Sequence, residues 1–280
     1  MKKDPSVLHA IPCGTVPAAC DRLKEKRAAE SIRAACDGQT AAVISVEKQE
    51  KTAQPPRLYD LTTLQRECNR LYGFTAQQTL DYLQSLYEKK LATYPRTDSQ
   101  YLTEDMTATA GSIVNYLLMR LPFAKGLSYT PNMKRVTDNS KVSDHHAVIP
   151  TAEIANTDLD VLPGGEREVL MLIAARLRGA TAAPHAYETV TAALDCTGHS
   201  FTAKGKTVLK DGWKAIDRAF RSTLKNKPKE DSEDNSAALP ELAEGPHFSD
   251  VAATVREGKS KPPARYTEDT QLSAMERAGS

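Results

Sequence analysis

The sequence predicts an α+β fold in which a mainly helical segment is inserted into a β-rich one. Apolar residues recur at helical spacing over residues 61–71, 75–90, 103–121 and 166–181. Strand patterns flank these helices, with a β-branched run at 41–52 and alternating apolar residues over 187–208. The period changes from helix to strand directly after Pro184. A helical domain between two stretches of strand is therefore expected.

The expected domain boundaries follow from these changes in pattern. Pro55-Pro56 breaks regular structure and separates the first strand region from the helices. Few large apolar residues lie between 221 and 240, which is typical of a linker without fixed structure. The expected parts are residues 1–56 and 186–260 as two segments of one β-rich domain, 57–185 as the helical domain, a disordered linker at about 221–240, and 261–280 as the start of a following helix.

Composition narrows the class of protein. The chain has 280 residues, a formal net charge of +1, 40% apolar and 26% charged residues. No apolar run reaches the roughly 18 residues of a membrane span, and no signal peptide opens the chain. Five cysteines without a CxxC pair argue against a disulfide framework and a zinc site. A cytoplasmic protein without a membrane partner is expected, and any DNA must be held by local basic patches.

Individual elements are predicted from their end signals. Helical spacing predicts a helix over about 15–35, ended by Asp37-Gly38. The helix over 61–71 ends at Gly73, and Thr75 with Gln78 forms the capping box of the next helix. Two helices around such a turn, followed by an extended segment, indicate a winged-helix-like unit. Such units bind DNA in many proteins and serve only for packing in others. Further predictions are a helix capped by Thr103, a strand over 248–255 and a helix over 267–278.

The last predicted helix lies at the end of the chain, with nothing following it to pack against. A helix in this position suggests a piece of a longer protein. Asp211-Gly212-Trp213 follows the alternating strands, so Trp213 is expected in the second β-rich segment.

One extended stretch carries the strongest chemical signal. Pro95 disfavours a helical conformation at Tyr94, and residues two apart in an extended chain share a face. Tyr94, Arg96 and Asp98 are therefore expected to project together. A free tyrosine, with a pKa of about 10, is a nucleophile only beside a positive charge or a base. An arginine supplies that charge and can hold two phosphate oxygens.

A histidine pair and the acidic residues were considered as further site residues. His145 and His146 are adjacent, so in an extended segment at most one of them faces a given site. Adjacent histidines also make a poor metal site. The chain contains neither a DxD nor a DxDxE cluster for Mg²⁺, and no phosphate-binding glycine loop. No metal site is expected within these residues.

Four motifs occur together, in a fixed order. They are PPRLYDLTTLQ at 55–65, LATYPRTDSQYL at 91–102, SDHHAVIPT at 143–151 and Asp211-Gly212-Trp213. This set closely resembles the type IA DNA topoisomerases, most of all the bacterial topoisomerase III branch. The resemblance covers the chain from about residue 14 to its end.

The resemblance implies roles for particular residues. Tyr94 matches the tyrosine that attacks a DNA phosphodiester and becomes linked to the 5′-phosphate of the broken strand. Arg96 matches the arginine that positions tyrosine and phosphate, His145 matches the histidine at the scissile phosphate, and Asp98 matches a supporting acid. The resemblance also marks three further motif residues as candidates for DNA contact: Thr97, Ser99 and His146.

The resemblance also implies a mechanism and a fold. Family members pass a strand through the protein-bridged gap and reseal it without ATP. Their fold is a torus, of which this chain resembles the arch. Their Mg²⁺ is bound by a Toprim domain that is not recognised in this sequence. The 280-residue chain alone is therefore expected to be an inactive, monomeric piece that binds single-stranded DNA.

Two other classes compete with this interpretation. Tyrosine recombinases use a spread Arg-His-Arg set and a late tyrosine, and relaxases use two histidines separated by one apolar residue, together with a metal. Neither pattern matches here. The alternative from another class is a non-catalytic single-stranded DNA-binding or structural module in which Tyr94 only packs.

Overall fold

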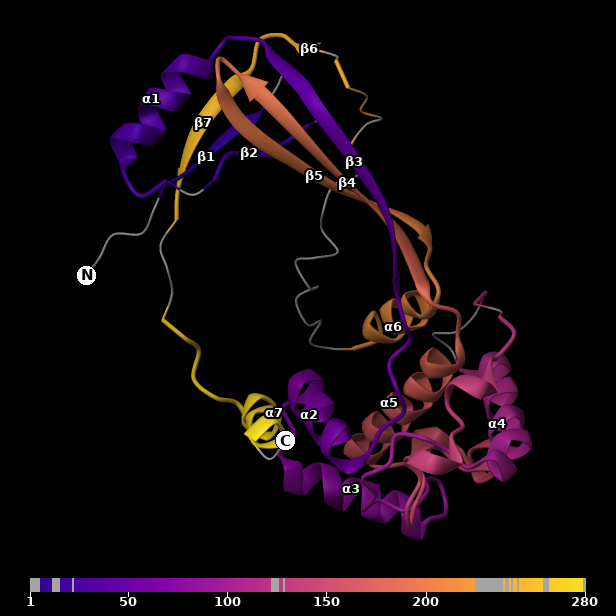
Figure 1. Ribbon diagram of the computed structural model, residues 1–280. Helices are drawn as coiled ribbons and strands as arrows, with labels where there is room; N and C mark the ends of the chain where they lie inside the picture. The colour runs from indigo at the N-terminus through magenta and orange to yellow at the C-terminus, as the bar shows by residue number, and fades with distance from the viewer. Residues whose placement is uncertain are drawn as a thin grey trace. The chain divides into compact units, whose positions relative to one another are not determined.

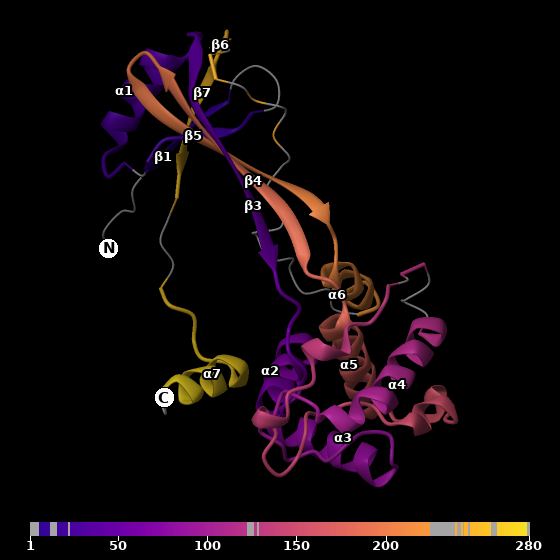
Figure 2. The same ribbon diagram turned by 45° about the vertical axis from the view of Figure 1, so that its right-hand side comes forward.

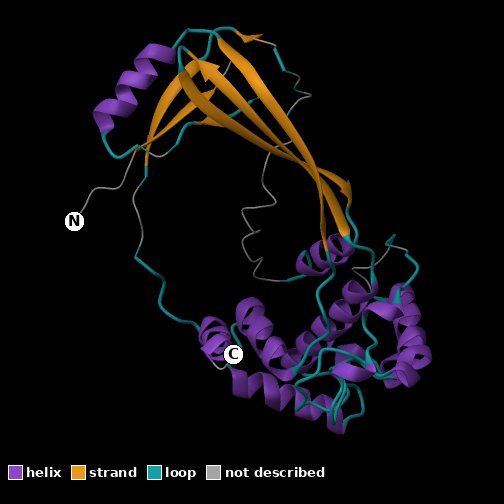
Figure 3. Ribbon diagram, in the orientation of Figure 1, coloured by secondary structure: helices purple, strands orange, loops and turns teal. Residues whose placement is uncertain are grey.

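We analysed a computed structural model of the protein. It describes residues 6–11, 16–21, 23–121, 126–127, 129–224, 239, 242, 244–245, 247–258 and 262–278. The described chain divides into two compact units, each assembled from separate segments. The β unit consists of Met1–Thr52, Ala186–Leu209 and Glu230–Ala264, and the helical unit consists of Ala53–His185, Lys210–Lys229 and Arg265–Ser280. Strands gather in the first and helices in the second (Figure 3). The α+β fold class is confirmed.

The β unit is built on one sheet with the strand order β6-β3-β4-β5-β2-β1-β7. Its longest strands, β3, β4 and β5, run side by side (Figure 1, Figure 2). The turn between β4 and β5 is Thr197-Gly198, and both residues have positive φ, of 52° and 82°. Two successive positive φ values are the geometry of a tight hairpin turn. The strands are β1 (Ser6–Ile11), β2 (Ala18–Ala19), β3 (Ala41–Ala53), β4 (His185–Cys196), β5 (His199–Lys210), β6 (His247–Phe248) and β7 (Ala252–Glu257).

One predicted helix of the β unit is shorter than expected. The structure places α1 at Lys26–Cys36, whereas the sequence predicted a helix from about residue 15. Ala18 and Ala19 instead pair with β5 in an antiparallel register. Val16 and Ala18 are buried in the core of this unit, so sheet pairing outweighs local helical spacing at these positions.

The predicted strand over 248–255 is also divided in two. Asp250 has a φ of 55°, a left-handed conformation that a continuous strand does not allow. Strand β6 therefore ends at Phe248, and β7 begins at Ala252.

Capping residues mark the ends of α2 and the start of α3 in the helical unit. Asp60 caps α2 by accepting a 2.7 Å hydrogen bond from Thr63 N, and Gly73 ends the helix with a φ of 73°. The capping box of α3 forms as predicted, with Gln78 N donating to Thr75 Oγ1 at 3.1 Å. The α-helices of this unit are α2 (Leu61–Tyr72), α3 (Ala76–Glu88), α4 (Thr107–Arg120), α5 (Gly164–Thr181), α6 (Trp213–Arg221) and α7 (Glu268–Ala278).

The short 3-10 helices of the helical unit lie between its α-helices. They are η1 (Glu104–Met106), η3 (Met133–Arg135), η4 (Asn139–Lys141), η5 (Ala152–Ala155) and η6 (Leu159–Val161). The helix predicted from Thr103 begins with η1, and Thr103 makes no side-chain cap there. Asn139 Oδ1 accepts the hydrogen bond of Glu104 N instead.

Two C-terminal features differ from their expected places. Trp213 opens α6 in the helical unit rather than continuing the β-rich segment. Its indole Nε1 donates to Ala53 O at 3.0 Å, and its backbone N donates to Ala183 O at 2.9 Å. Helix α7 was expected to have nothing to pack on, but it packs against α2, where Arg66 pairs with Asp269 and Glu276. Most of the predicted linker at 221–240 lies outside the described residues.

Candidate active site around Tyr94

Three of the motif segments meet in the helical unit. Residues 145–151 lie between the segment that leads into α2 and the segment that follows α3. Backbone hydrogen bonds hold the three together, and they need no particular side chain. These bonds are Val148 N–Tyr59 O (2.8 Å), Thr93 N–Ile149 O (3.0 Å) and Leu61 N–Thr97 O (3.0 Å).

The segment after α3 shows the expected alternation of burial. Tyr94 is half-buried, and Arg96 and Asp98 are exposed. The intervening side chains are buried: Pro95, Thr97 and Ser99. This is the pattern of an extended chain with one face on the core. Within the described part of the chain, the side chains of Arg96 and Asp98 make no hydrogen bond or ion pair.

The structure brings Tyr94 and His145 into direct contact. Their ring centroids lie 4.1 Å apart with an interplanar angle of 32°. Tyr87, from the last turn of α3, approaches the Tyr94 ring edge-on at 5.7 Å. Aromatic pairs at these separations favour offset and edge-to-face geometries. The Tyr94 ring is thus held by two neighbours, while its hydroxyl has no hydrogen-bond partner among the described residues.

Two residues expected as possible DNA contacts have their hydroxyls engaged inside the unit. Thr97 is 6% exposed and donates from Oγ1 to His145 O at 2.9 Å. The same oxygen accepts from Ser99 N at 3.1 Å. Ser99 is 5% exposed, and its hydroxyl donates to Lys141 O at 2.8 Å. These contacts argue against DNA contact by either hydroxyl and indicate that both hold the motif segments in register.

The two adjacent histidines have different surroundings. His146 is half-buried, and its Nδ1 lies 2.8 Å from Ala147 O, within hydrogen-bond distance. His145 is exposed apart from its contact with Tyr94. Across the described residues, no three His, Cys, Asp or Glu side chains form a group that could hold a metal ion.

Comparison with known proteins decides the family. Residues 16–279 match the family described as DNA topoisomerase. This chain belongs to the DNA topoisomerases. Similar proteins include the DNA topoisomerase 3 of Bacillus licheniformis, 39% identical over 252 residues, and that of Bacillus subtilis, 38% identical over 245 residues. These matches cover 88% and 85% of this chain, and they support the predicted type IA assignment and its topoisomerase III branch.

A solved structure supports the fold. The full-length topoisomerase I from Thermotoga maritima superposes with a TM-score of 0.73 over 99% of this chain, at 20% sequence identity. The superposition covers 44% of that structure. This topoisomerase chain spans about a third of the length of the Bacillus relatives, since the matches cover 33% of each.

A network of charges supports the motif segment at 57–61. Arg176 of α5 stacks on the Tyr59 ring at 4.1 Å and donates to Tyr59 Oη at 2.8 Å. It also pairs with Glu67, which Arg70 and Arg221 approach as well. Burial raises the pKa of Glu67, but the three arginines outweigh it and hold the pKa below its ordinary value. Helices α2, α5 and α6 are thereby joined behind the candidate site.

Several groups near the site carry no functional signal in the sequence. Tyr87 lies seven residues before Tyr94, at the end of an amphipathic helix, where its apolar neighbours suggest only packing. Arg57 is part of the PPRLYDL motif but was not assigned a role. Tyr101 and Lys141 lie close to Arg57 only in the folded chain, so their spacing in the sequence carried no signal.

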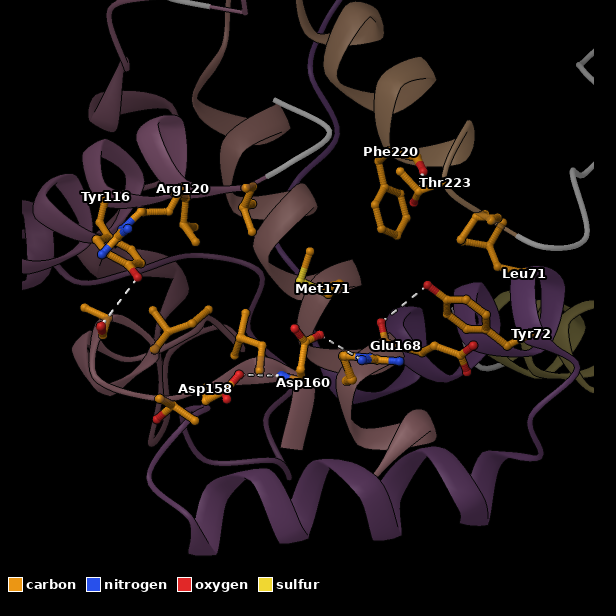
Figure 4. Close-up of a pocket in the computed structure, with 18 residues that line it drawn as sticks. Leu71, Tyr72, Tyr116, Arg120, Asp158, Asp160, Glu168, Met171, Phe220 and Thr223 are labelled. Atoms are coloured by element: carbon orange, nitrogen blue, oxygen red, sulfur yellow. Dashed lines mark hydrogen bonds and ion pairs between the residues drawn. The ribbon is translucent and has the colours of Figure 1, made fainter. Parts of the chain in front are cut away.

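The helical unit also contains a cavity of about 800 Å³ (Figure 4). It is lined by α2, α4, α5, η6 and the end of α6, and none of the expected site residues lines it. Polar groups at its wall pair with one another, as Tyr72 Oη donates to Glu168 O and Arg167 pairs with Asp160. The cavity is therefore separate from the candidate active site.

No helix among the described residues is both long and apolar enough to cross a membrane.

Proposed function

We propose that Tyr94 is the nucleophile of an ATP-independent type IA topoisomerase that breaks and reseals one DNA strand. The observation that carries the proposal is the stacking of Tyr94 against His145 at 4.1 Å, with exposed Arg96 and Asp98 on the same extended segment. The residues come from two motifs about 50 positions apart. A packing role alone gives no reason for an exposed histidine stacked on a half-buried phenol.

The proposed cleavage step exchanges one phosphodiester for another. Tyr94 Oη attacks the phosphorus, the P–O3′ bond breaks, and the tyrosine becomes joined to the 5′-phosphate. The phenol proton leaves Tyr94 and the departing O3′ gains a proton, so the step is balanced. Resealing is the reverse attack by the 3′-hydroxyl. Because one ester bond is formed for each one broken, the cycle needs no ATP.

The neighbouring side chains have distinct roles in this proposal. Arg96 holds two phosphate oxygens and balances the charge that develops on them. His145 donates a hydrogen bond to the scissile phosphate while its ring orients the phenol. Asp98 is the supporting acid that orients Arg96. His146 is left without a direct part in the chemistry.

The remaining parts of the proposal concern the whole enzyme. We propose that residues outside this segment bind the Mg²⁺ of the whole enzyme, and that the side chains named above act on the phosphate directly. The substrate is single-stranded DNA, held mainly through phosphates, and the protein acts as a monomer in the cytoplasm. The 280-residue chain alone does not relax supercoiled DNA with Mg²⁺, and measurable relaxation by it contradicts this part.

A chimera tests the nucleophile directly. This chain replaces the matching segment of the Bacillus subtilis relative, and the chimera is incubated with a 3′-labelled single-stranded oligonucleotide before denaturation. Label should migrate with the protein, and Tyr94→Phe should abolish it. His145→Gln should lower the cleavage rate by about 10²–10³-fold, the effect of removing one hydrogen-bond donor to the developing charge. Tyr116→Phe, a tyrosine on α4 in the same unit, is the matched control and should leave the adduct unchanged.

The outcome separates the two candidate functions. If Tyr94→Phe still forms the covalent adduct, Tyr94 is not the nucleophile. If the chimera binds DNA but forms no adduct, the chain is a non-catalytic DNA-binding module and the proposal fails.

A further inference from the structure

Two cations and a tyrosine ring form a second group of side chains in the helical unit. The Arg57 guanidinium lies 5.2 Å from the ring centroid of Tyr101, and Lys141 Nζ lies 4.6 Å from it. Arg57 and Lys141 are exposed, and Tyr101 is half-buried. We refer to these three residues as the Arg57 cluster. A tyrosine ring attracts a cation to its face when the cation lies within about 6 Å of the ring centroid.

The donors of the two cations are used to different extents. Arg57 has five guanidinium N–H donors, and none makes a hydrogen bond or ion pair within the described ranges. Lys141 has three donors, of which one reaches Asp138 at 3.0 Å and one reaches Tyr101 Oη at 3.5 Å. Arg57 therefore presents a complete fork, whereas Lys141 presents one remaining donor. An arginine fork matches two oxygens of a phosphate group.

Backbone contacts tie this cluster to the proposed active site. Ala147 N donates to Tyr101 O at 2.8 Å, and Ala147 lies two residues after His145. Two residues of extended chain span about 7 Å. Ser99 Oγ donates to Lys141 O at 2.8 Å, which joins the other side of the cluster to the tyrosine segment. A DNA strand at His145 thus has the cluster within reach of its neighbouring phosphates.

We propose that the Arg57 cluster is a phosphate-binding site for the single DNA strand, next to the scissile phosphate. Arg57 is its clamp, Tyr101 holds the guanidinium over its ring, and Lys141 adds a second positive charge. The proposal rests on the proposed function for the identity of the ligand. It adds a strand-holding site that takes no part in the transfer of the phosphoryl group.

A binding experiment tests the site. Fluorescence anisotropy measures how tightly the 280-residue chain binds a fluorescein-labelled oligothymidylate at several salt concentrations. Each cation that neutralises a phosphate of a single strand contributes about 0.7 to the slope of log K against log salt. Arg57→Gln should weaken binding about tenfold and lower the slope by about 0.7. Lys141→Gln should have a smaller effect on affinity, and the double variant should lower the slope by about 1.4.

Two controls separate a built site from general charge. Arg57→Lys keeps the charge but loses the fork, so it should retain the slope while binding several-fold more weakly. Arg120→Gln removes a cation that stacks on Tyr116 at 5.9 Å in the same unit, and it should leave binding unchanged. All three substituted residues are exposed, and a thermal melt verifies that each variant is folded.

Three results overturn the proposal: no binding by the wild-type chain at low salt, an unchanged affinity in Arg57→Gln, or an equal loss in Arg120→Gln. Failure of this site is distinguishable from failure of the proposed function. A chimera that forms the Tyr94 adduct while Arg57→Gln binds DNA normally refutes only the cluster. If the chimera forms no adduct but its DNA binding still depends on Arg57, only the assignment of Tyr94 as the nucleophile is refuted.

Discussion

Removing the hydroxyl of Thr97 should uncouple His145 from the tyrosine segment. Thr97→Val keeps the shape of the side chain but removes the Oγ1 atom. His145 O then loses its 2.9 Å hydrogen bond, and Ser99 N loses its 3.1 Å hydrogen bond. A lost hydrogen bond in a buried position costs about 1–3 kcal/mol. For a domain of about 150–250 residues, each kcal/mol lowers Tm by about 2–4 °C, so a loss of about 2 kcal/mol gives about 4–8 °C.

The same substitution should change the contact between the two rings. The His145 side-chain protons lie near the Tyr94 ring, whose centroid is 4.1 Å from that of the imidazole. Their NMR resonances, assigned with His145→Gln, should move in Thr97→Val towards the positions of an exposed histidine. Thr97→Ser restores the hydroxyl and should restore both Tm and the resonances.

A matched control distinguishes this effect from the general cost of replacing threonine. Thr157 is half-buried, and the hydrogen bond that it donates to Glu153 O is exposed to solvent, so Thr157→Val should lower Tm by less than about 2 °C. The reasoning is refuted if Thr97→Val melts within about 1 °C of the wild type and leaves the His145 resonances in place.

Three further predictions follow from the helical unit and the cysteines. Glu67→Gln should cost about 1.5–3 kcal/mol near pH 7 in denaturant titrations. Because the pKa of folded Glu67 is lowered, this contribution is present above the unfolded pKa of about 4.3 and is lost as pH falls further, so the variant and wild type should converge in acid. Gly212→Ala places a Cβ 2.3 Å from Pro184 O at a φ of 55°, so it should lower the free energy of unfolding by more than about 1 kcal/mol. Gly73 has a φ of 73° but open space around it, so Gly73→Asn should lower the free energy of unfolding by less. Burial raises the pKa of Cys68 to about 12 and that of Cys196 to about 11. Mass spectrometry should therefore find both thiols unalkylated at pH 8 in the native protein and alkylated in denaturant. Alkylation of either cysteine in the native protein contradicts its burial.

Signals close together in the sequence predicted much of the fold. The end of α2 and the start of α3 were predicted correctly because Gly73 and Thr75 act on backbone groups within four residues of themselves. The alternation at 187–208 predicted β4 and β5 because one face of each strand is buried. The exposed faces of Tyr94, Arg96 and Asp98 followed from the same period of two.

Long-range pairing decided what the sequence could not. Helical spacing near Ala18 predicted a helix, but Ala18 pairs in the sheet with β5, whose residues lie about 185 positions further along the chain. Trp213 and α7 joined the helical unit through partners far along the chain, at Ala53 and Arg66. A local pattern identifies which face of a segment is apolar, but it does not identify the segment that covers this face.

The candidate site shows the same division. The sequence alone determined the chemistry available at Tyr94, because the motif residues and the conformation imposed by Pro95 are local properties. Only the tertiary structure decided which groups meet it. His145 reaches the phenol through hydrogen bonds between segments about 50 residues apart, and Thr97 faces inward to hold that histidine rather than outward to hold DNA. Burial and backbone pairing, which act between distant residues, made that selection.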